Sequence, residues 1–229
     1  MKSTYLKGLL IFGIILGFTY CTHSNLIDDE PNQPEEGDSI NLKDLFDEGA
    51  DFKSYIDALD DPTLWKANYE EGQQIREDLL SNARTIPQSW KLLAITDEDN
   101  LDAENTIPYI AQLVEQVHSL ELRILSKEHG QNLVADHQTY DGRSSTPLVL
   151  VLNDDYQKVG CWVERPAELQ RWVVYNRDTL DQEEIDSHML TWYQRNQGTR
   201  TIDEITRIIK SANSGDQICP VPEEGLRGR

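Results

Sequence analysis

The chain has 229 residues, of which 27% are charged and 38% are hydrophobic, and its formal net charge at pH 7 is -20. This length has room for one mixed domain with appendages, since a domain usually takes about 100 to 200 residues. The negative charge would repel nucleic acid, so we expect no nucleic acid as a partner. The acidity indicates a solvated, soluble surface, and specific cation binding is the alternative.

The first twenty residues have the pattern of a secretory signal. Lys2 and Lys7 give a charged start, and an apolar run from Gly8 to Tyr20 follows. That run is shorter than the roughly 20 residues that a membrane span needs. We therefore expect residues 1–20 to be a signal peptide and the protein to be exported.

Cys21 stands directly after the apolar run. Bacterial lipoproteins carry at this point the cysteine that is lipidated, although a small residue is expected where this chain has Tyr20. The sequence thus predicts a lipoprotein of a bacterial cell envelope, anchored to the membrane through an N-terminal lipid on Cys21, on the periplasmic or outer-membrane side. An uncleaved anchor and ordinary secretion are the alternatives, and either one still exports the domain.

Residues 21–40 have the composition of a disordered tether. They contain Pro31, Pro34 and six acidic residues, with no Lys or Arg. Such a segment cannot bury enough apolar surface to become ordered, and its like charges repel one another.

Residues 41–89 are predicted to form a helical N-terminal extension. Apolar side chains recur at helical spacing over residues 42–46 and 52–59. The same spacing continues from Pro62, a residue suited to the first helical position, through Leu80. A loop over residues 84–88 ends the extension.

The next segments alternate between strand and helix patterns. Residues 90–96 and 120–125 are predicted strands, separated by a helix from Ala103 to Ser119. A short helix over residues 131–140 follows the second strand. This order is a βαβ unit, which places two strands side by side in parallel.

The remaining pattern is a hairpin followed by helices. Strands over residues 148–152 and 159–163 flank the turn sequence Asn-Asp-Asp. A helix is predicted from Pro166 through Trp172. Asp181 and Glu184 form a predicted capping box for a helix that runs to about residue 197. Thr201 and Glu204 form a second one for a helix that runs to about residue 212. We expect a domain over residues 90–213 and a flexible tail over residues 214–229.

Four segments of this chain resemble one known family, in the expected order. They are ITDEDNLDA at residues 95–103, RSSTP at 143–147 before the strand LVLVL, WVERPAE at 162–168, and Trp192-Tyr193 with Gly198, Thr201, Glu204 and Ile205. Together they resemble bacterial thioredoxin-family proteins with helical extensions, over about residues 40–212. The resemblance implies an α/β fold, a thioredoxin-like sandwich whose central mixed sheet has helices on both faces.

The resemblance also implies that the active site is degenerate. The family segment that aligns with ITDEDNLDA reads roughly Ile-Thr-Glu-Asp-Trp-Cys-Gly-Asp-Ala, so the family's cysteine falls on Asn100. A thiol at a helix start has a lowered pKa, whereas an amide cannot ionise or form a mixed disulfide. We therefore interpret Asp99, Asn100 and Asp102 as a degenerate active-site loop. Asp102 matches the family's aspartate but has no thiol to exchange a proton with.

The acidic character of this loop has two interpretations. Asp97, Glu98, Asp99, Asn100 and Asp102 lie together before and inside the first turn of the predicted helix. Asn and Asp side chains accept the free N–H groups of a helix start, and this capping role is the interpretation that we favour. A carboxylate cluster for a cation or a basic peptide is the alternative.

Pro147 corresponds in the resemblance to the cis-proline that faces the active-site cysteines of thioredoxin-like folds. The resemblance implies a cis bond between Thr146 and Pro147, bordering a groove for an extended peptide substrate. A trans proline that opens a strand is the alternative, because a missing N–H is harmless there.

Cys161 and Cys219 are the cysteines that remain after export. In an oxidising compartment an even pair suggests a structural disulfide, which would tie the tail to the last strand. A buried free Cys161 with a disordered tail is the alternative.

The sequence predicts neither a metal site nor a cofactor. The five histidines lack the spacing of metal ligands and are interpreted as solvated; they are His23, His118, His129, His137 and His188. Gly-rich phosphate loops and serine-nucleophile elbows are also missing from the sequence.

Two functional hypotheses follow. The first is a redox-inactive thioredoxin-like domain with a binding or accessory role, whose partner is an unknown protein or peptide. The second is an enzyme, a thiol-disulfide oxidoreductase or isomerase that uses Cys161 or Cys219. The first predicts that the protein is not an enzyme.

Overall fold

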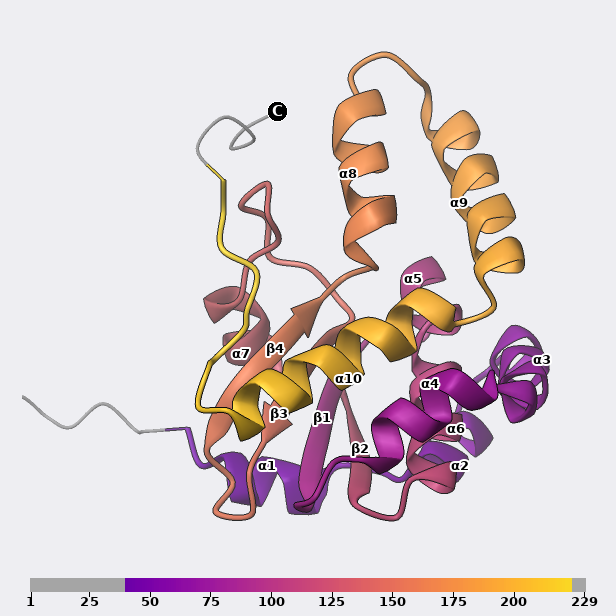
Figure 1. The fold of residues 1–229 in the computed structure, drawn as a ribbon. Coiled ribbons are helices and arrows are strands. Elements are labelled where there is room, and N and C mark those ends of the chain that lie inside the picture. The colour runs from indigo at the N-terminus through magenta and orange to yellow at the C-terminus, as the bar shows by residue number, and fades with distance from the viewer. Residues whose placement is uncertain (1–39, 224–229) are drawn as a thin grey trace, which may run out of the picture. The chain divides into compact units, whose positions relative to one another are not determined.

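The computed structural model describes residues 40–223. In this range the chain forms a mixed four-stranded sheet flanked by helices (Figure 1), which confirms the predicted α/β fold class. The strands are β1 (Trp90–Thr96), β2 (Leu120–Ser126), β3 (Leu148–Leu152) and β4 (Lys158–Val163). Their order across the sheet is β2-β1-β3-β4, with β1 parallel to β2 and antiparallel to β3, and β3 antiparallel to β4.

The helices fall into three groups along the chain. Before the sheet come α1 (Leu42–Glu48), α2 (Phe52–Asp57), α3 (Thr63–Glu71), the 3-10 turn η1 (Gly72–Gln74) and α4 (Glu77–Arg84). Between strands lie α5 (Leu101–Glu104), α6 (Ile107–Gln116) and α7 (Gln131–Asp136). After the sheet come α8 (Ala167–Asn176), α9 (Gln182–Asn196) and α10 (Thr199–Asn213).

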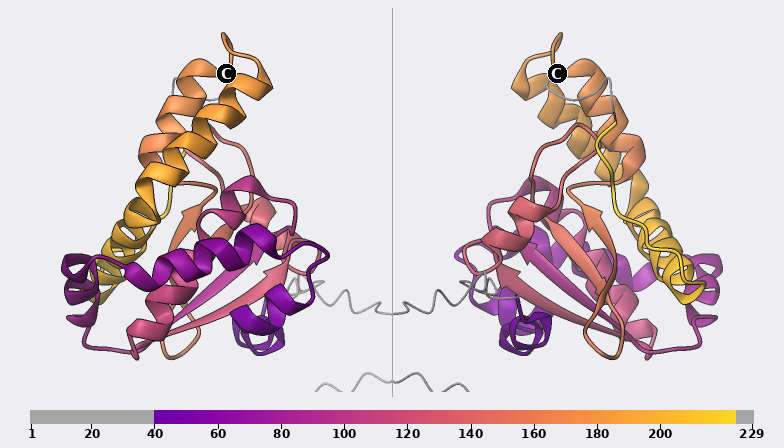
Figure 2. Two further views of the ribbon diagram at one scale, coloured as in Figure 1. Left: turned by 90° about the vertical axis from the view of Figure 1, so that its right-hand side faces the viewer. Right: turned by 90° about the vertical axis from the view of Figure 1, so that its left-hand side faces the viewer.

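The sheet is buried between two unequal layers, as Figure 2 shows. Alternate residues of a strand point to opposite faces, so each strand contributes to two cores. Leu92 and Val149 join the larger core with α6, α10 and the N-terminal helices α2 to α4. Leu93 and Leu150 join the smaller core, which α1 and α7 cover. The predicted extension over residues 41–89 is therefore part of the hydrophobic core.

The helix predicted from Pro62 to Leu80 is divided in the structure. Gly72 passes so close to α6 that a Cβ added there would lie 3.0 Å from Cγ of Gln112. At Ile75 the backbone leaves the helical region, with φ -51° and ψ 132°. The helical pattern is thus interrupted where the chain passes against α6, and sequence periodicity alone does not contain this contact.

The helix predicted from Ala103 to Ser119 is also divided, into α5 and α6. Pro108 has no N–H, so the carbonyl of Glu104 loses the donor that a continuous helix would offer it. Asn68 of α3 supplies that donor, since its Nδ2 lies 2.7 Å from the Glu104 oxygen. The break after α5 is thus stabilised by a side chain that is distant in sequence.

The capping box predicted at Thr201 is wrong. Helix α10 begins earlier, after Gly198, whose φ of 70° suits glycine. Glu204 reaches away from its own helix instead, and its carboxylate accepts hydrogen bonds from Nε1 of Trp162 at 2.9 Å and from the backbone N–H of Ala167 at 3.0 Å. By contrast, the predicted capping box of Asp181 and Glu184 is present at the start of α9.

The segment after α10 is fixed to β4 at Ile218 and Cys219 and to the loop after α7 at Glu223, although the sequence predicts a flexible tail from residue 214. Cys161 of β4 and Cys219 form a disulfide. The N–H of Cys161 donates to the carbonyl of Ile218 at 2.8 Å, and the N–H of Glu223 donates to that of Tyr140 at 2.8 Å. These contacts hold the segment beside β4.

The predicted signal peptide, Cys21 and most of the tether lie outside the described residues. Across residues 40–223, every helix is too short or too polar to span a membrane.

Candidate functional site

Asn100 is the N-cap of α5. Its Oδ1 accepts a hydrogen bond from the N–H of Ala103 at 2.9 Å, and its Nδ2 lies 3.2 Å from both the carbonyl oxygen and Oγ1 of Thr146. The amide therefore joins the start of α5 to the loop before β3. An amide held in this way has no ionisable proton and no nucleophilic electron pair to offer a substrate.

The acidic residues around Asn100 have different surroundings. Asp97 is tied into the site, because its Oδ2 accepts from Oγ1 of Thr146 at 3.0 Å and from Nζ of Lys127 at 3.1 Å. Asp99, in contrast, is exposed on the loop. The structure therefore brings Asn100 and Asp97 to Thr146 and leaves Asp99 in solvent.

The bond between Thr146 and Pro147 is cis. Thr146 is 3% exposed, and Pro147 is buried as well. The Thr146 carbonyl faces Asn100, so an extended peptide placed beside Pro147 would meet an oxygen that already accepts a hydrogen bond.

Asp102 points into the protein from the first turn of α5. Its Oδ1 accepts from the hydroxyl of Tyr193 at 2.6 Å, and its Oδ2 lies 2.8 Å from Nη2 of Arg165. Burial raises the pKa of Asp102 to about 6, although the Arg165 charge opposes this rise. Asp102 therefore links α5 to α9 and to the segment after β4.

A chain of alternating charges continues from Arg165. Arg165 pairs with Glu164 at 2.8 Å, Glu164 with Arg143 at 2.9 Å, and Arg143 with Asp141 at 2.7 Å. Arg177, the C-cap of α8, contacts the same Asp141 oxygen, at 2.5 Å. Burial opposes ionisation of Asp141, but hydrogen bonds from its arginine and threonine neighbours outweigh it and hold its pKa below the usual range.

A pocket of about 390 Å³ opens beside this network, between α5 and the hairpin of α8 and α9. Three arginines, two acidic residues, a glutamine and five apolar residues line it, namely Arg143, Arg165, Arg177, Asp102, Asp186, Gln182, Leu101, Val173, Leu180, Ile185 and Met189. Two buried donors of the lining residues, Nε of Arg165 and Nη2 of Arg177, have no hydrogen-bond partner in the described part of the chain. Both nitrogens are almost completely shielded from solvent, so other atoms of the arginine side chains form the surface of the pocket.

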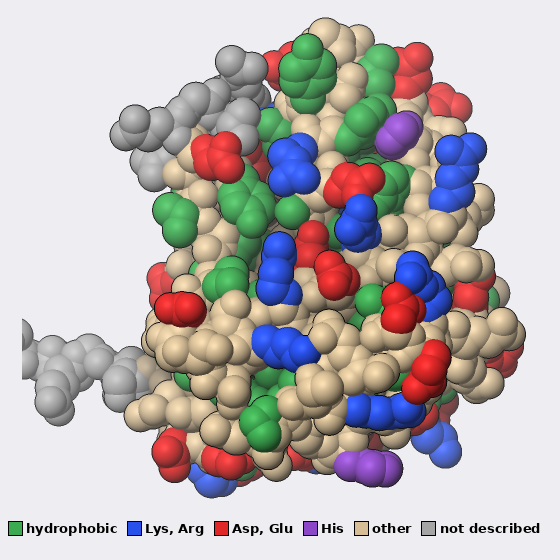
Figure 3. Space-filling model, viewed as in Figure 1, with side chains coloured by type: hydrophobic (Ala, Val, Ile, Leu, Met, Phe, Trp, Pro, Cys, Tyr) green, Lys and Arg blue, Asp and Glu red, His purple; other side chains and the backbone are tan. Residues whose placement is uncertain are grey.

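The hairpin of α8 and α9 stands above the sheet in Figure 1 and has a small core of its own. Trp172 of α8 stacks on His188 of α9, with ring centroids 3.5 Å apart. Tyr175 is 81% exposed at the outer end of α8. Figure 3 shows hydrophobic side chains over this hairpin, with acidic and basic side chains interspersed across the same face of the molecule.

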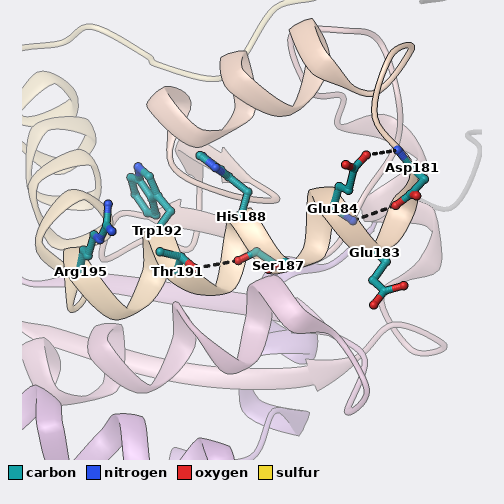
Figure 4. Close-up of a pocket in the computed structure, with 8 residues that line it drawn as sticks. All are labelled: Asp181, Glu183, Glu184, Ser187, His188, Thr191, Trp192 and Arg195. Atoms are coloured by element: carbon teal, nitrogen blue, oxygen red, sulfur yellow. Dashed lines mark hydrogen bonds between the residues drawn. The ribbon is translucent and has the colours of Figure 1, made fainter.

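A shallower groove of about 640 Å³ runs along the exposed side of α9 (Figure 4). Its lining comes from one helix and its N-cap. The hydrogen bonds among these residues are local, such as those of the capping box and that from Oγ1 of Thr191 to the carbonyl of Ser187 at 2.9 Å. The groove does not bring together groups from different elements, so we favour the pocket beside Asp102 as the candidate site.

The two cysteines lie away from this pocket, on the face of the sheet that α1 and α7 cover. His137, which the sequence interprets as solvated, is only 7% exposed, so that interpretation is wrong for this histidine. Its ring has a ligand atom within 4.8 Å of both Cys161 and Cys219 sulfurs. Burial lowers the pKa of His137.

The comparisons with known proteins agree with this fold. Residues 49–184 match a protein-family model described as thioredoxin. A crystal structure of a protein of unknown function from Pseudomonas aeruginosa is similar, with a TM-score of 0.59 and 18% identity over 76% of this chain and 99% of that chain. An HIV epitope scaffold is similar with a TM-score of 0.55 and 19% identity, over 74% of this chain and 97% of that chain.

A search of curated proteins finds no match. The two solved structures share less than a fifth of their residues with this chain, so they show the fold alone. The family match covers more than half of the chain, and it shows that this protein belongs to the thioredoxin family.

Proposed function

We propose that this protein is a redox-inactive thioredoxin-like domain that binds an extended peptide or protein segment in the pocket between α5 and the α8–α9 hairpin. The observation that carries the proposal is Asn100, an amide at the N-cap of the helix that follows β1. In the family that the sequence resembles, this position carries the reactive cysteine. A domain that keeps the fold while an amide occupies the position of the thiol has lost the chemistry of disulfide exchange.

The pocket beside Asp102 supports a binding role. It adjoins Asn100 through Leu101 and has an apolar wall next to arginine side chains. Arg143, Arg165 and Arg177 line the pocket, and a guanidinium group is a hydrogen-bond donor with no acceptor capacity. A ligand with an apolar side chain next to a carboxylate would fill the apolar wall and offer acceptors to these donors.

The proposal includes export and anchoring through a lipid on Cys21. The charged start, the short apolar run and the cysteine that follows it support this location, and the acidic tether would hold the domain away from the membrane. Mass spectrometry of the membrane fraction tests the anchor. A diacylglyceryl-modified chain that begins at Cys21 is expected, and an intact Met1 or a cut elsewhere contradicts it.

An insulin reduction assay with dithiothreitol tests the loss of redox activity. We expect turnover no higher than in buffer. Turnover that persists in a variant with both Cys161→Ser and Cys219→Ser would refute the proposal. Turnover that disappears in this double variant would favour the alternative, a thiol-disulfide oxidoreductase or isomerase that uses Cys161 or Cys219.

A peptide selection tests the binding role separately. Peptides with a free carboxylate are selected on the immobilised protein, and their affinities are measured for the wild type and for Arg177→Met. We expect at least about a tenfold loss in Arg177→Met, because a charged hydrogen bond contributes about 1.5–3 kcal/mol. Arg195→Met, on the exposed side of α9, is the matched control. Equal binding to both variants would contradict the assignment of this pocket.

A further inference from the structure

Three potential metal ligands from distant parts of the chain meet on the α7 side of the sheet. Cys161 lies on β4, Cys219 lies on the segment after α10, and His137 directly follows α7. Their ligand atoms all lie within 4.8 Å of one another. Cys161 is 1% exposed and His137 is 7% exposed, so water has little access to two of the three.

The His137 ring is held in the orientation that a metal ligand requires. Its Nδ1 lies 2.6 Å from the carbonyl oxygen of Leu133. A carbonyl oxygen can only accept, so Nδ1 carries the proton and Nε2 has the free electron pair. Metal-binding histidines typically donate their second ring nitrogen to a carbonyl or carboxylate in this way.

The electron pair on Nε2 faces Nζ of Lys158 at 2.9 Å. A lysine ammonium is a donor without acceptor capacity, so it occupies the side of the ring that a metal ion would take. Lys158 is an exposed residue at the start of β4, and its side chain can turn into solvent when a stronger Lewis acid arrives.

We infer that the reduced protein binds one zinc-class divalent cation through His137, Cys161 and Cys219, and that the Cys161–Cys219 disulfide closes this site. Opening it requires a thiol reductant. Two molecules of that thiol give up two electrons and become a disulfide, while Cys161 and Cys219 become thiols. The cation then replaces the two thiol protons and takes the Nε2 electron pair of His137.

Two sulfurs and one imidazole nitrogen favour zinc among the abundant divalent cations, because thiolates are soft ligands. Zinc usually has four ligands, so a water molecule would complete the site. At a Zn–S distance of about 2.3 Å, two sulfurs on one tetrahedral zinc are about 3.8 Å apart. That separation is within the 4.8 Å that already encloses the three ligand atoms.

The site is independent of the proposed peptide pocket. Both cysteines pack with the core under α1 and α7, whereas the pocket is lined by α5, α8, α9 and three connecting segments near them. Failure of one proposal therefore leaves the other unchanged.

A cobalt and zinc titration tests the inference. The full chain carries Cys21→Ser, so that Cys161 and Cys219 are its only thiols. One sample is reduced with dithiothreitol and separated from it without oxygen, and a second stays oxidised. We expect one equivalent of zinc and a sulfur-to-cobalt charge-transfer band in the reduced sample, with neither in the oxidised sample. Equal zinc content in both samples would overturn the inference.

Variants then identify the ligands. Cys219→Ser should abolish the charge-transfer band and zinc binding at stoichiometric concentration. His137→Gln should weaken zinc binding by at least about tenfold, as the loss of metal-site residues commonly does. His118→Gln, at an exposed histidine, is the matched control. Circular dichroism confirms that each variant is folded, and a folded His137→Gln that binds zinc like the wild type would contradict the site.

Discussion

The side-chain amide of Asn100 donates a hydrogen bond to the carbonyl of Thr146, the residue that precedes the cis-proline. The cap of α5 and the loop before β3 are therefore joined through one side chain. One of the two lone pairs of the Thr146 carbonyl is thus already used within the protein, and a peptide beside Pro147 would have the other one available.

Asn100→Ala should destabilise the protein by about 1–2 kcal/mol, because it removes the cap of α5 and the contact with Thr146. Urea denaturation followed by circular dichroism measures the free energy of unfolding. Asn213→Ala, at an exposed asparagine at the end of α10, should change it by less than about 0.5 kcal/mol. Equal effects of the two substitutions would show that the Asn100 cap adds no stability.

The buried carboxyl of Asp102 should make stability depend on pH. Its pKa in the folded protein is about 6, above the model-peptide range of an aspartate, so the folded state binds the extra proton. The stability that this residue contributes is then highest at low pH and falls as pH rises from about 4 to about 6, by at most about 3 kcal/mol.

Asp102→Asn separates this effect from other titrations, because the amide does not titrate. The difference in unfolding free energy, wild type minus Asp102→Asn, should decrease between pH 4.5 and pH 7. Urea denaturation of both proteins at the two pH values measures it. If the wild type and Asp102→Asn differ in unfolding free energy by the same amount at both pH values, the folded-state pKa of Asp102 is not raised.

The Cys161–Cys219 disulfide should stabilise the domain substantially. The two residues are separated by 58 positions, and the loss of chain entropy on closing such a loop corresponds to about 4 kcal/mol at 25 °C. A Cys161→Ser and Cys219→Ser variant should therefore unfold at a clearly lower urea concentration. Limited proteolysis should also cut it first near Ile218, while the wild type resists. An unchanged urea midpoint would contradict a stabilising role.

Glu204 should be needed to hold α8 against the sheet. Its carboxylate accepts from Trp162 Nε1 and from the first N–H of α8, so Glu204→Ala leaves two donors without a partner. We expect a loss of about 2 kcal/mol or more, because each unsatisfied buried group costs about 1–3 kcal/mol and the Ala167 N–H is only partly buried. Glu183→Ala on the exposed side of α9 is the matched control. Thermal melts of both variants give the comparison, and similar melts would contradict this role.

Local patterns in the sequence predict the strands and several helix starts well. The residue patterns place β1, β2, β3 and β4 within one residue at each end. The segment of β3 is uniformly apolar, whereas that of β2 alternates apolar residues with Glu121 and Arg123. The capping box of Asp181 and Glu184 is also found correctly, since both partners lie within one turn.

The errors arise where a distant residue decides a local structure. The break between α5 and α6 depends on Asn68, which lies 36 positions from Glu104, and no periodicity contains that contact. Asp102 accepts a hydrogen bond from Tyr193, which lies 91 positions away in the sequence. The local sequence predicts that Asp102 belongs to a helix cap, but the structure buries its carboxyl group. His137 is buried for the same reason, because Lys158 of β4 and Cys219 after α10 lie close to its ring.

The segment after α10 also has a consequence for solubility. An uncovered outer strand offers unpaired N–H and carbonyl groups, and it can recruit strands from other molecules into aggregates. Here Gly160 of the outer strand β4 pairs with Ile218, and on the opposite edge Ile124 of β2 pairs with Ala50. Both margins of the sheet are thus partly paired with other segments of the same chain, which leaves fewer free backbone groups for strands of other molecules.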